Sequence, residues 1–244
     1  MLSKSRLIVA IGLVLALAVS GIAFAQGTVN EAFVDGSVKP SKKLDKKKYK
    51  KTNLLLGIRN ENTITGTQVN PASEKISISK NVKVDLDKAP RCPVTLTNGT
   101  PTEAAKAQCP AASLIGTGEA EVQAPGNAVI ATPEVNVFNG PGPNQLQLHT
   151  YSPALGAASP VVPASIVNSD QGSKFKHMLS VPVAPETGAL LITKFNATLK
   201  RGTGVASVKC KPKTVTFLRE VTYKDGTSET AELTQKVKCK PKKK

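Results

Sequence analysis

Residues 214–223 read TVTFLREVTY, a stretch in which apolar side chains recur with the two-residue period of a β-strand. The apolar residues that share one face of this extended chain are Val215, Phe217, Val221 and Tyr223. An Asp-Gly dipeptide, typical of tight hairpin turns, occupies positions 225–226, and residues 227–237 can return alongside the first strand. This stretch therefore predicts an antiparallel β-hairpin close to the end of the chain.

Other segments show the same period or are rich in β-branched residues, and turn-forming Asn, Gly and Pro separate them. They are residues 54–59, 63–69, 76–86, 118–123, 134–138, 145–151, 175–183, 190–199 and 205–210. This spacing predicts an all-β fold, an antiparallel β-sandwich of the immunoglobulin-like or a related type, with one short helix at Thr102–Gln108. Residues 153–172, rich in Pro, Ala and Ser, predict a long surface loop. The pattern leaves open whether the strands form one sandwich or two smaller β units.

The sequence contains four cysteines, Cys92, Cys109, Cys210 and Cys239. Four cysteines allow three disulfide connectivities. The spacing favours the two local pairs, because the first two bracket a short segment and the last two flank the hairpin. A zinc site would need cysteines only a few residues apart, which this chain does not have. We therefore expect the disulfides Cys92–Cys109 and Cys210–Cys239.

The first 25 residues carry the three parts of a secretory signal peptide. Lys4 and Arg6 supply the positive charge, residues 7–19 are apolar, and the small-x-small triplet at 23–25 fits a cleavage site. An uncleaved anchor helix is the alternative, but the apolar run is shorter than the ~18 residues that a membrane span needs. Together with the cysteines, this pattern predicts an exported chain beginning at Gln26, with no transmembrane segment after cleavage.

The formal net charge of the chain is +16, and most of the excess lies near its two ends. Residues 39–51 hold eight Lys and one Asp, and residues 236–244 hold six Lys and no acidic residue. Without an apolar period, residues 26–51 predict a Lys-rich, disordered N-terminal arm. Residues 52–240 form the expected β-sandwich domain, and residues 241–244 form a basic tail.

Two interpretations of these basic ends stay open. They can simply keep the protein dispersed in solution, or they can tether it to the anionic lipids or wall polymers of a bacterial envelope. The tether would consist of Lys42, Lys43, Lys46, Lys47, Lys48, Lys50, Lys51, Lys242, Lys243 and Lys244. Specific nucleic-acid binding is disfavoured, because the chain is exported, its body is nearly balanced in charge, and few aromatic residues are available for stacking.

No catalytic, cofactor-binding or metal-ligating pattern is found in the sequence. The motifs G-x-S-x-G of serine hydrolases and H-E-x-x-H of zinc peptidases are absent. Asp85 and Asp87 lie two apart on an expected strand and could share one face, so with His149 they make up a rival hypothesis of a hydrolase or metal-dependent enzyme. Surface ion pairs and an ordinary strand-face histidine explain these residues more simply. A second rival, a ligand- or glycan-binding module, would expose Tyr151 or Phe175 at a concave patch.

Several short motifs from residue 90 onward occur in a recognisable order. They are PRCP at 90–93, EAAKAQCP at 103–110, IGTG at 115–118, FNGPG at 138–142 and YKDGT at 223–227. With this order of motifs the chain resembles a group of uncharacterised secreted proteins of actinobacteria, over roughly residues 52–240. The resemblance implies an exported β-rich domain and brings no catalytic residue with it.

These observations together lead us to expect an exported, non-enzymatic structural or binding protein of the bacterial cell envelope, without a cofactor. Its partner would be an anionic wall polymer or a membrane surface. The sequence does not address its oligomeric state.

Overall fold

We describe the fold from a computed structural model, which describes residues 30–62, 71–124, 128–182 and 190–241. The strands of these residues, in chain order, are β1 Asn30–Lys39, β2 Lys50–Lys51, β3 Asn53–Asn62, β4 Pro71–Ser79, β5 Val82–Val84, β6 Leu114–Ala124, β7 Ala128–Ala131, β8 Glu134–Asn139, β9 Gln145–Tyr151, β10 Val161–Asn168, β11 Phe175–Pro182, β12 Leu191–Leu199, β13 Ala206–Val208, β14 Thr214–Tyr223 and β15 Ser228–Lys236. The α-helix α1 spans Thr102–Gln108, and short 3-10 turns lie at Leu86–Lys88, Ala111–Ser113, Gly156–Ala158 and Arg201–Thr203. The expected signal peptide and the expected strand at 63–69 lie outside the described residues.

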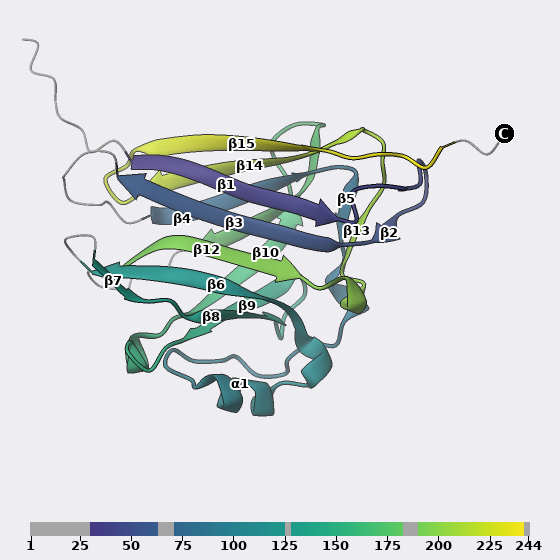
Figure 1. Cartoon of the computed structure of the whole chain (residues 1–244). Helices are drawn as coiled ribbons and strands as arrows, with labels where there is room; N and C mark the ends of the chain where they lie inside the picture. Colours follow the sequence, from purple (N-terminus) through teal and green to yellow (C-terminus); the bar gives the residue numbers. More distant parts are fainter. Residues whose placement is uncertain (1–29, 63–70, 125–127, 183–189, 242–244) are drawn as a thin grey trace, which may run out of the picture.

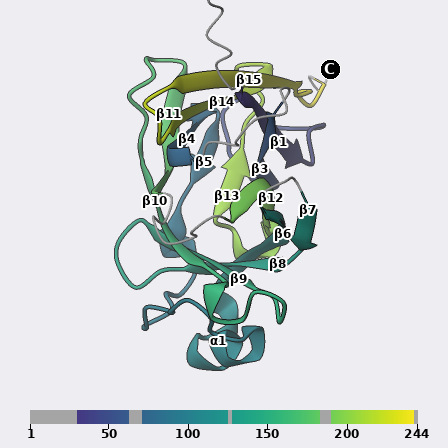
Figure 2. The same ribbon diagram turned by 90° about the vertical axis from the view of Figure 1, so that its left-hand side faces the viewer.

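Twelve of these strands form one continuous antiparallel sheet. Its order is β1-β3-β12-β6-β8-β9-β10-β11-β4-β14-β15, and β7 pairs with β6 beside that path. The sheet curls until its two edge strands, β1 and β15, come into contact, so it encloses a single large hydrophobic core as a nearly closed sandwich (Figure 2). The predicted all-β antiparallel fold with one short helix is confirmed.

Side chains, not a backbone ladder, join the two edge strands. The N–H of Ala32 in β1 donates to Glu229 Oε2 of β15 at 2.9 Å. The N–H of Val38 donates to Gln235 Oε1 at 2.8 Å, and Gln235 Nε2 donates back to the Val38 carbonyl at 3.4 Å. These bonds occupy backbone groups that an exposed edge strand would leave unpaired.

A small second sheet, β2-β13-β5, closes one end of the sandwich (Figure 1). Lys50 of β2 pairs with Val208 of β13, which pairs in turn with Val82 of β5. Both valines are fully buried and belong to the main core. This sheet therefore ties the lysine-rich segment before β3 to the body of the protein.

Both expected disulfides, Cys92–Cys109 and Cys210–Cys239, are present. The first closes the segment that carries α1, and a small cluster of buried side chains packs this segment against Phe138 of β8. The second joins the segments just before β14 and just after β15. Both predicted local pairings are thus confirmed.

The predicted disordered arm is wrong for the part of residues 26–51 that the structure describes. Residues 30–39 form β1, which pairs with β3 along its whole length. Val34, Val38 and Leu44 are buried in the main core, so this segment gains apolar burial that offsets the entropy of ordering it. Val34, Gly36 and Val38 alternate with the polar residues Asp35, Ser37 and Lys39, and the density of lysines nearby obscured that period.

The predicted surface loop at 153–172 is also wrong in part, because residues 161–168 form β10. Pro163 is tolerated there since pairing of β10 with β11 begins only at Ser165. Around Pro163, β10 therefore has a registered partner on one side alone, β9.

Candidate functional site

The two lysine-rich ends of the chain lie side by side in the folded protein. The N–H of Leu44 donates to the Lys238 carbonyl at 3.1 Å, and the N–H groups of Lys238 and Lys240 donate to the carbonyls of Ser41 and Leu44, both at 2.8 Å. Leu44 is fully buried beneath this contact. The segment after β1 and the segment after β15 are therefore held together by backbone hydrogen bonds and one apolar anchor.

A third basic segment joins them through the second disulfide. Cys210 is bonded to Cys239, and its N–H donates to the Asp45 carbonyl at 2.9 Å. The N–H of Val237 donates to the Lys213 carbonyl at 2.8 Å. The hexapeptide VKCKPK occurs at 208–213 and again at 237–242. Its described parts, residues 208–213 and 237–241, thus come together from both sides of the β14–β15 hairpin.

The turn between β4 and β5 completes the arrangement. Asn81 is fully buried, and its side-chain amide donates to the carbonyls of Lys209, Pro212 and Thr214 at 3.0–3.2 Å. On the surface, the Tyr49 hydroxyl donates to the Lys80 carbonyl at 3.2 Å, and Lys209 Nζ lies 5.0 Å from the centre of the Tyr49 ring. One buried amide therefore joins the segment 80–85 to the backbone of the lysine-bearing segment 209–214.

We call the resulting surface the basic face and define it as residues 41–51, 80–85, 209–213 and 236–240. These residues include fifteen Lys and two Asp, a net charge of +13 out of +16 for the whole chain. The face lies at the end of the sandwich that carries β2, β13 and β5 (Figure 1). The charge is therefore concentrated on one ordered end of the protein.

The two carboxylates of the basic face are already engaged. The N–H groups of Lys48 and Lys47 donate to Asp45 Oδ1 at 2.9 and 2.8 Å, and these bonds lower the pKa of that carboxyl. The hydrogen bond from Lys83 Nζ, at 2.8 Å, lowers the pKa of Asp85. Within the described part of the chain, Lys83 is the one lysine of the face that forms an ion pair. Uncompensated like charges at such density favour a polyanionic partner.

The sequence-predicted tether residues fall on this face as far as the structure describes them. Exposed positions are held by Lys42, Lys43, Lys46, Lys47, Lys48 and Lys51, and Lys50 is half-buried. Lys242, Lys243 and Lys244 lie outside the described residues. We expected two separate flexible ends, and the described residues form one ordered surface instead.

Further lysines of the face were missed as site residues. They are Lys80, Lys83, Lys209, Lys211, Lys213, Lys236, Lys238 and Lys240. Two signals could have found several of them: the repeated hexapeptide and the expected Cys210–Cys239 pairing. A disulfide between two VKCKPK copies must bring the lysines that flank each cysteine together.

The structure does not assemble the rival enzyme site. Residues 86–88 form a 3-10 turn, so Asp85 and Asp87 do not share a strand face as expected, and Asp87 pairs with Arg91 at 3.1 Å. His149 is fully buried on β9, where its Nε2 lies 2.8 Å from the Thr100 carbonyl. Burial lowers the pKa of His149. No group of three His, Cys, Asp or Glu able to hold a metal occurs in the described residues.

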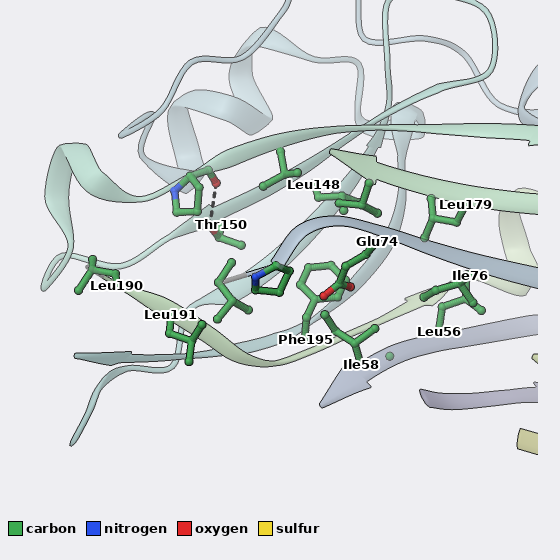
Figure 3. A pocket seen from close by; sticks show the side chains of 16 residues that line it. Leu56, Ile58, Glu74, Ile76, Leu148, Thr150, Leu179, Leu190, Leu191 and Phe195 are labelled. Atoms are coloured by element: carbon green, nitrogen blue, oxygen red, sulfur yellow. Dashed lines mark hydrogen bonds between the residues drawn. The ribbon is translucent and has the colours of Figure 1, made fainter. Parts of the chain in front are cut away.

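The expected exposed aromatic patch is not formed by Phe175, which is buried. Tyr151 is half-buried at the end of β9. A different concave feature, drawn in Figure 3, is lined by residues at the end of the sandwich opposite the basic face. It is a cavity of about 70 Å³ between β3, β4 and β9–β12, and neither Tyr151 nor Phe175 lines it.

Comparisons with known proteins place the chain in no family. No family model matches it, and no curated protein matches it. Among solved structures, a cohesin module from a Clostridium perfringens family 33 glycoside hydrolase aligns at 8% identity and a TM-score of 0.32, covering 86% of this chain and 98% of the module. A likeness this weak says nothing about function. No helix in the part of the chain that the structure describes is long and apolar enough to cross a membrane.

Proposed function

We propose that this protein is an exported, non-enzymatic binding protein of the bacterial cell envelope that attaches to an anionic polymer through its basic face. The observation that carries the proposal is the net charge of +13 gathered on one ordered surface. The signal peptide expected from the sequence and the two disulfides are compatible with an extracellular setting.

The composition of the face favours a polymer over a bilayer. Among the described residues, large exposed apolar side chains are Tyr49, Val94, Val129, Ile130 and Val167. Only Tyr49 belongs to the basic face, so this surface offers almost nothing to insert between lipid tails. At an anionic membrane, electrostatic attraction would be the sole source of binding for this face, at about 1 kcal/mol per lysine near the surface.

The face carries lysines and no arginine. An ammonium group acts as a point charge and lacks the planar fork with which arginine grips one phosphate or carboxylate in two places. Many such charges suit a polymer with closely repeated anionic groups, and they demand no fixed geometry from each group. The expected ligand class is therefore a linear polyanion, such as a phosphate-bearing wall polymer.

The proposal is tested by titrating the chain from Gln26 onward with three probes: long-chain polyphosphate, vesicles that contain phosphatidylglycerol, and duplex DNA. We expect the tightest binding to polyphosphate, with the logarithm of the binding constant falling linearly with the logarithm of salt concentration, as counterion release requires. Neutral phosphatidylcholine vesicles serve as the control and should not bind. Absence of binding to polyphosphate at low salt, or tighter binding to vesicles or DNA, would contradict the proposal.

A further inference from the structure

The end of the sandwich opposite the basic face holds an apolar cavity of about 70 Å³ (Figure 3). Its walls come from six strands and include Leu56, Ile58, Ile76, Leu148, Leu179 and Phe195. Protein interiors are close-packed and keep few voids larger than a water molecule. An apolar cavity of this size is a candidate binding space for an apolar guest.

Both polar side chains among the lining residues, Thr150 and Glu74, take part in hydrogen bonds with other parts of the protein. The Thr150 hydroxyl donates to the Pro160 carbonyl at 2.7 Å, so it offers no free hydrogen (Figure 3). Glu74 Oε1 accepts a 2.6 Å hydrogen bond from the buried guanidinium of Arg219. A guest inside this cavity would find almost no hydrogen-bonding partner, which selects for an apolar group. Water is poorly held for the same reason.

The space is elongated along the strands. A second apolar cavity of about 30 Å³ shares four lining residues with the first, Leu56, Leu148, Leu179 and Phe195. On β12 the first cavity is lined by residues 190–192 and Phe195, and the second by Phe195, Ala197 and Leu199. The second cavity therefore lies deeper in the core, in line with the first. A narrow apolar space in two successive parts suits a chain better than a ring.

We propose that this pocket binds the end of an alkyl chain, with the head group left at the rim. Three half-buried side chains that line the outer cavity, Val162, Val181 and Ile192, provide apolar surface for the part of the chain nearest the rim. This site is independent of the basic face, because none of the lining residues of either cavity belongs to that face except Val84.

The test uses methyl NMR on the chain from Gln26 onward, titrated with straight-chain alcohols from butanol to octanol. Methyl signals of Ile58, Ile76 and Leu148 should shift in a saturable way, and those of the exposed Val129 and Ile130 should not. Each added methylene should tighten binding about fourfold until both cavities are filled, and further carbons should add little. Octanoate and dihexanoyl phosphatidylcholine, as further arms, distinguish a free amphiphile from a membrane lipid as the source of the chain.

A matched pair of variants on β10 separates this site from general hydrophobic adsorption. Val162 lines the cavity, whereas Val167 is exposed and does not. Val162→Phe should fill the outer cavity and weaken octanol binding at least tenfold, and Val167→Phe should leave it unchanged. Equal binding by both variants would overturn the proposal. Because a larger side chain can also disturb folding, the methyl titration of the unaltered chain is a second, independent test of the proposal. Absence of a saturable shift at the lining residues would also overturn the proposal.

Discussion

The Arg219→Met variant is expected to unfold with a free energy about 3–5 kcal/mol lower than that of the parent chain. Arg219 is fully buried on β14, and it crosses the core to three other strands. Its hydrogen bonds run to Phe33 O at 3.1 Å, Arg59 O at 3.1 Å, Asn60 Oδ1 at 2.7 Å and Glu74 Oε1 at 2.6 Å. Removing the guanidinium leaves the buried Glu74 carboxylate without its counter-charge and removes the hydrogen bonds to two strand carbonyls.

Urea unfolding of single and double variants measures this effect and identifies its cause. If the isolated carboxylate dominates the loss, Arg219→Met combined with Glu74→Leu should recover a large part of the stability, because apolar pairs often replace buried ion pairs at little cost. Arg59→Met is a suitable control, since Arg59 is exposed and its ion pair with Glu61 lies on the surface. That control should lose no more than about 1 kcal/mol. A double variant as unstable as Arg219→Met would contradict this account of the ion pair.

Reversing three charges on the basic face should weaken polyphosphate binding at least about a hundredfold. The variant is Lys46→Glu, Lys47→Glu and Lys48→Glu, which lowers the net charge of the face by six. At about 1 kcal/mol for each lysine that contacts an anionic surface, loss of three attractive charges alone accounts for this factor. The fold should survive, because all three side chains are exposed and the bonds to Asp45 Oδ1 come from backbone N–H groups.

A matched control keeps the same change in net charge and moves it away from the face. Lys106, Lys194 and Lys224 are exposed and lie outside all four segments of the basic face. Their replacement by Glu should weaken binding only a few-fold, because charges beyond a Debye length of ~8 Å are largely screened at physiological salt. Binding is compared by fluorescence titration at constant ionic strength. Equal losses in the two triple variants would mean that net charge, and not the face, governs binding.

The hairpin and both disulfides could be predicted because their signals are local. The two-residue period of 214–223 and the Asp-Gly turn after it lie within one short window, as do the cysteines that flank them. Position 219 also carried a signal: it falls on the same face as Val215, Phe217, Val221 and Tyr223, and it is Arg. A charge on the buried face of a strand indicates a buried partner, although the sequence does not say that the partner is Glu74.

Long-range features had no comparable signal. The contact that joins β1 to β15 links residues 197 positions apart, and it depends on how far the whole sheet curls. The order of eleven strands along the sheet is likewise set by packing between distant segments. For the same reason, the sequence predicted two separate basic ends instead of one basic face. Composition averaged over 26–51 hid the period of β1, and nothing local places Leu44 beside Cys239. The apolar cavity, formed by six strands, is a product of that packing as well.

The central claim is that lysines from separate parts of the chain form one surface that binds a polyanion as a unit. Lysine footprinting tests this claim most directly: the protein is acetylated with and without polyphosphate, and the modified sites are quantified by mass spectrometry. We predict simultaneous protection in 42–51, 209–213 and 236–240, with Lys106, Lys194 and Lys224 modified equally in both samples. Protection confined to one of the three segments, or spread evenly over all exposed lysines, would contradict the account.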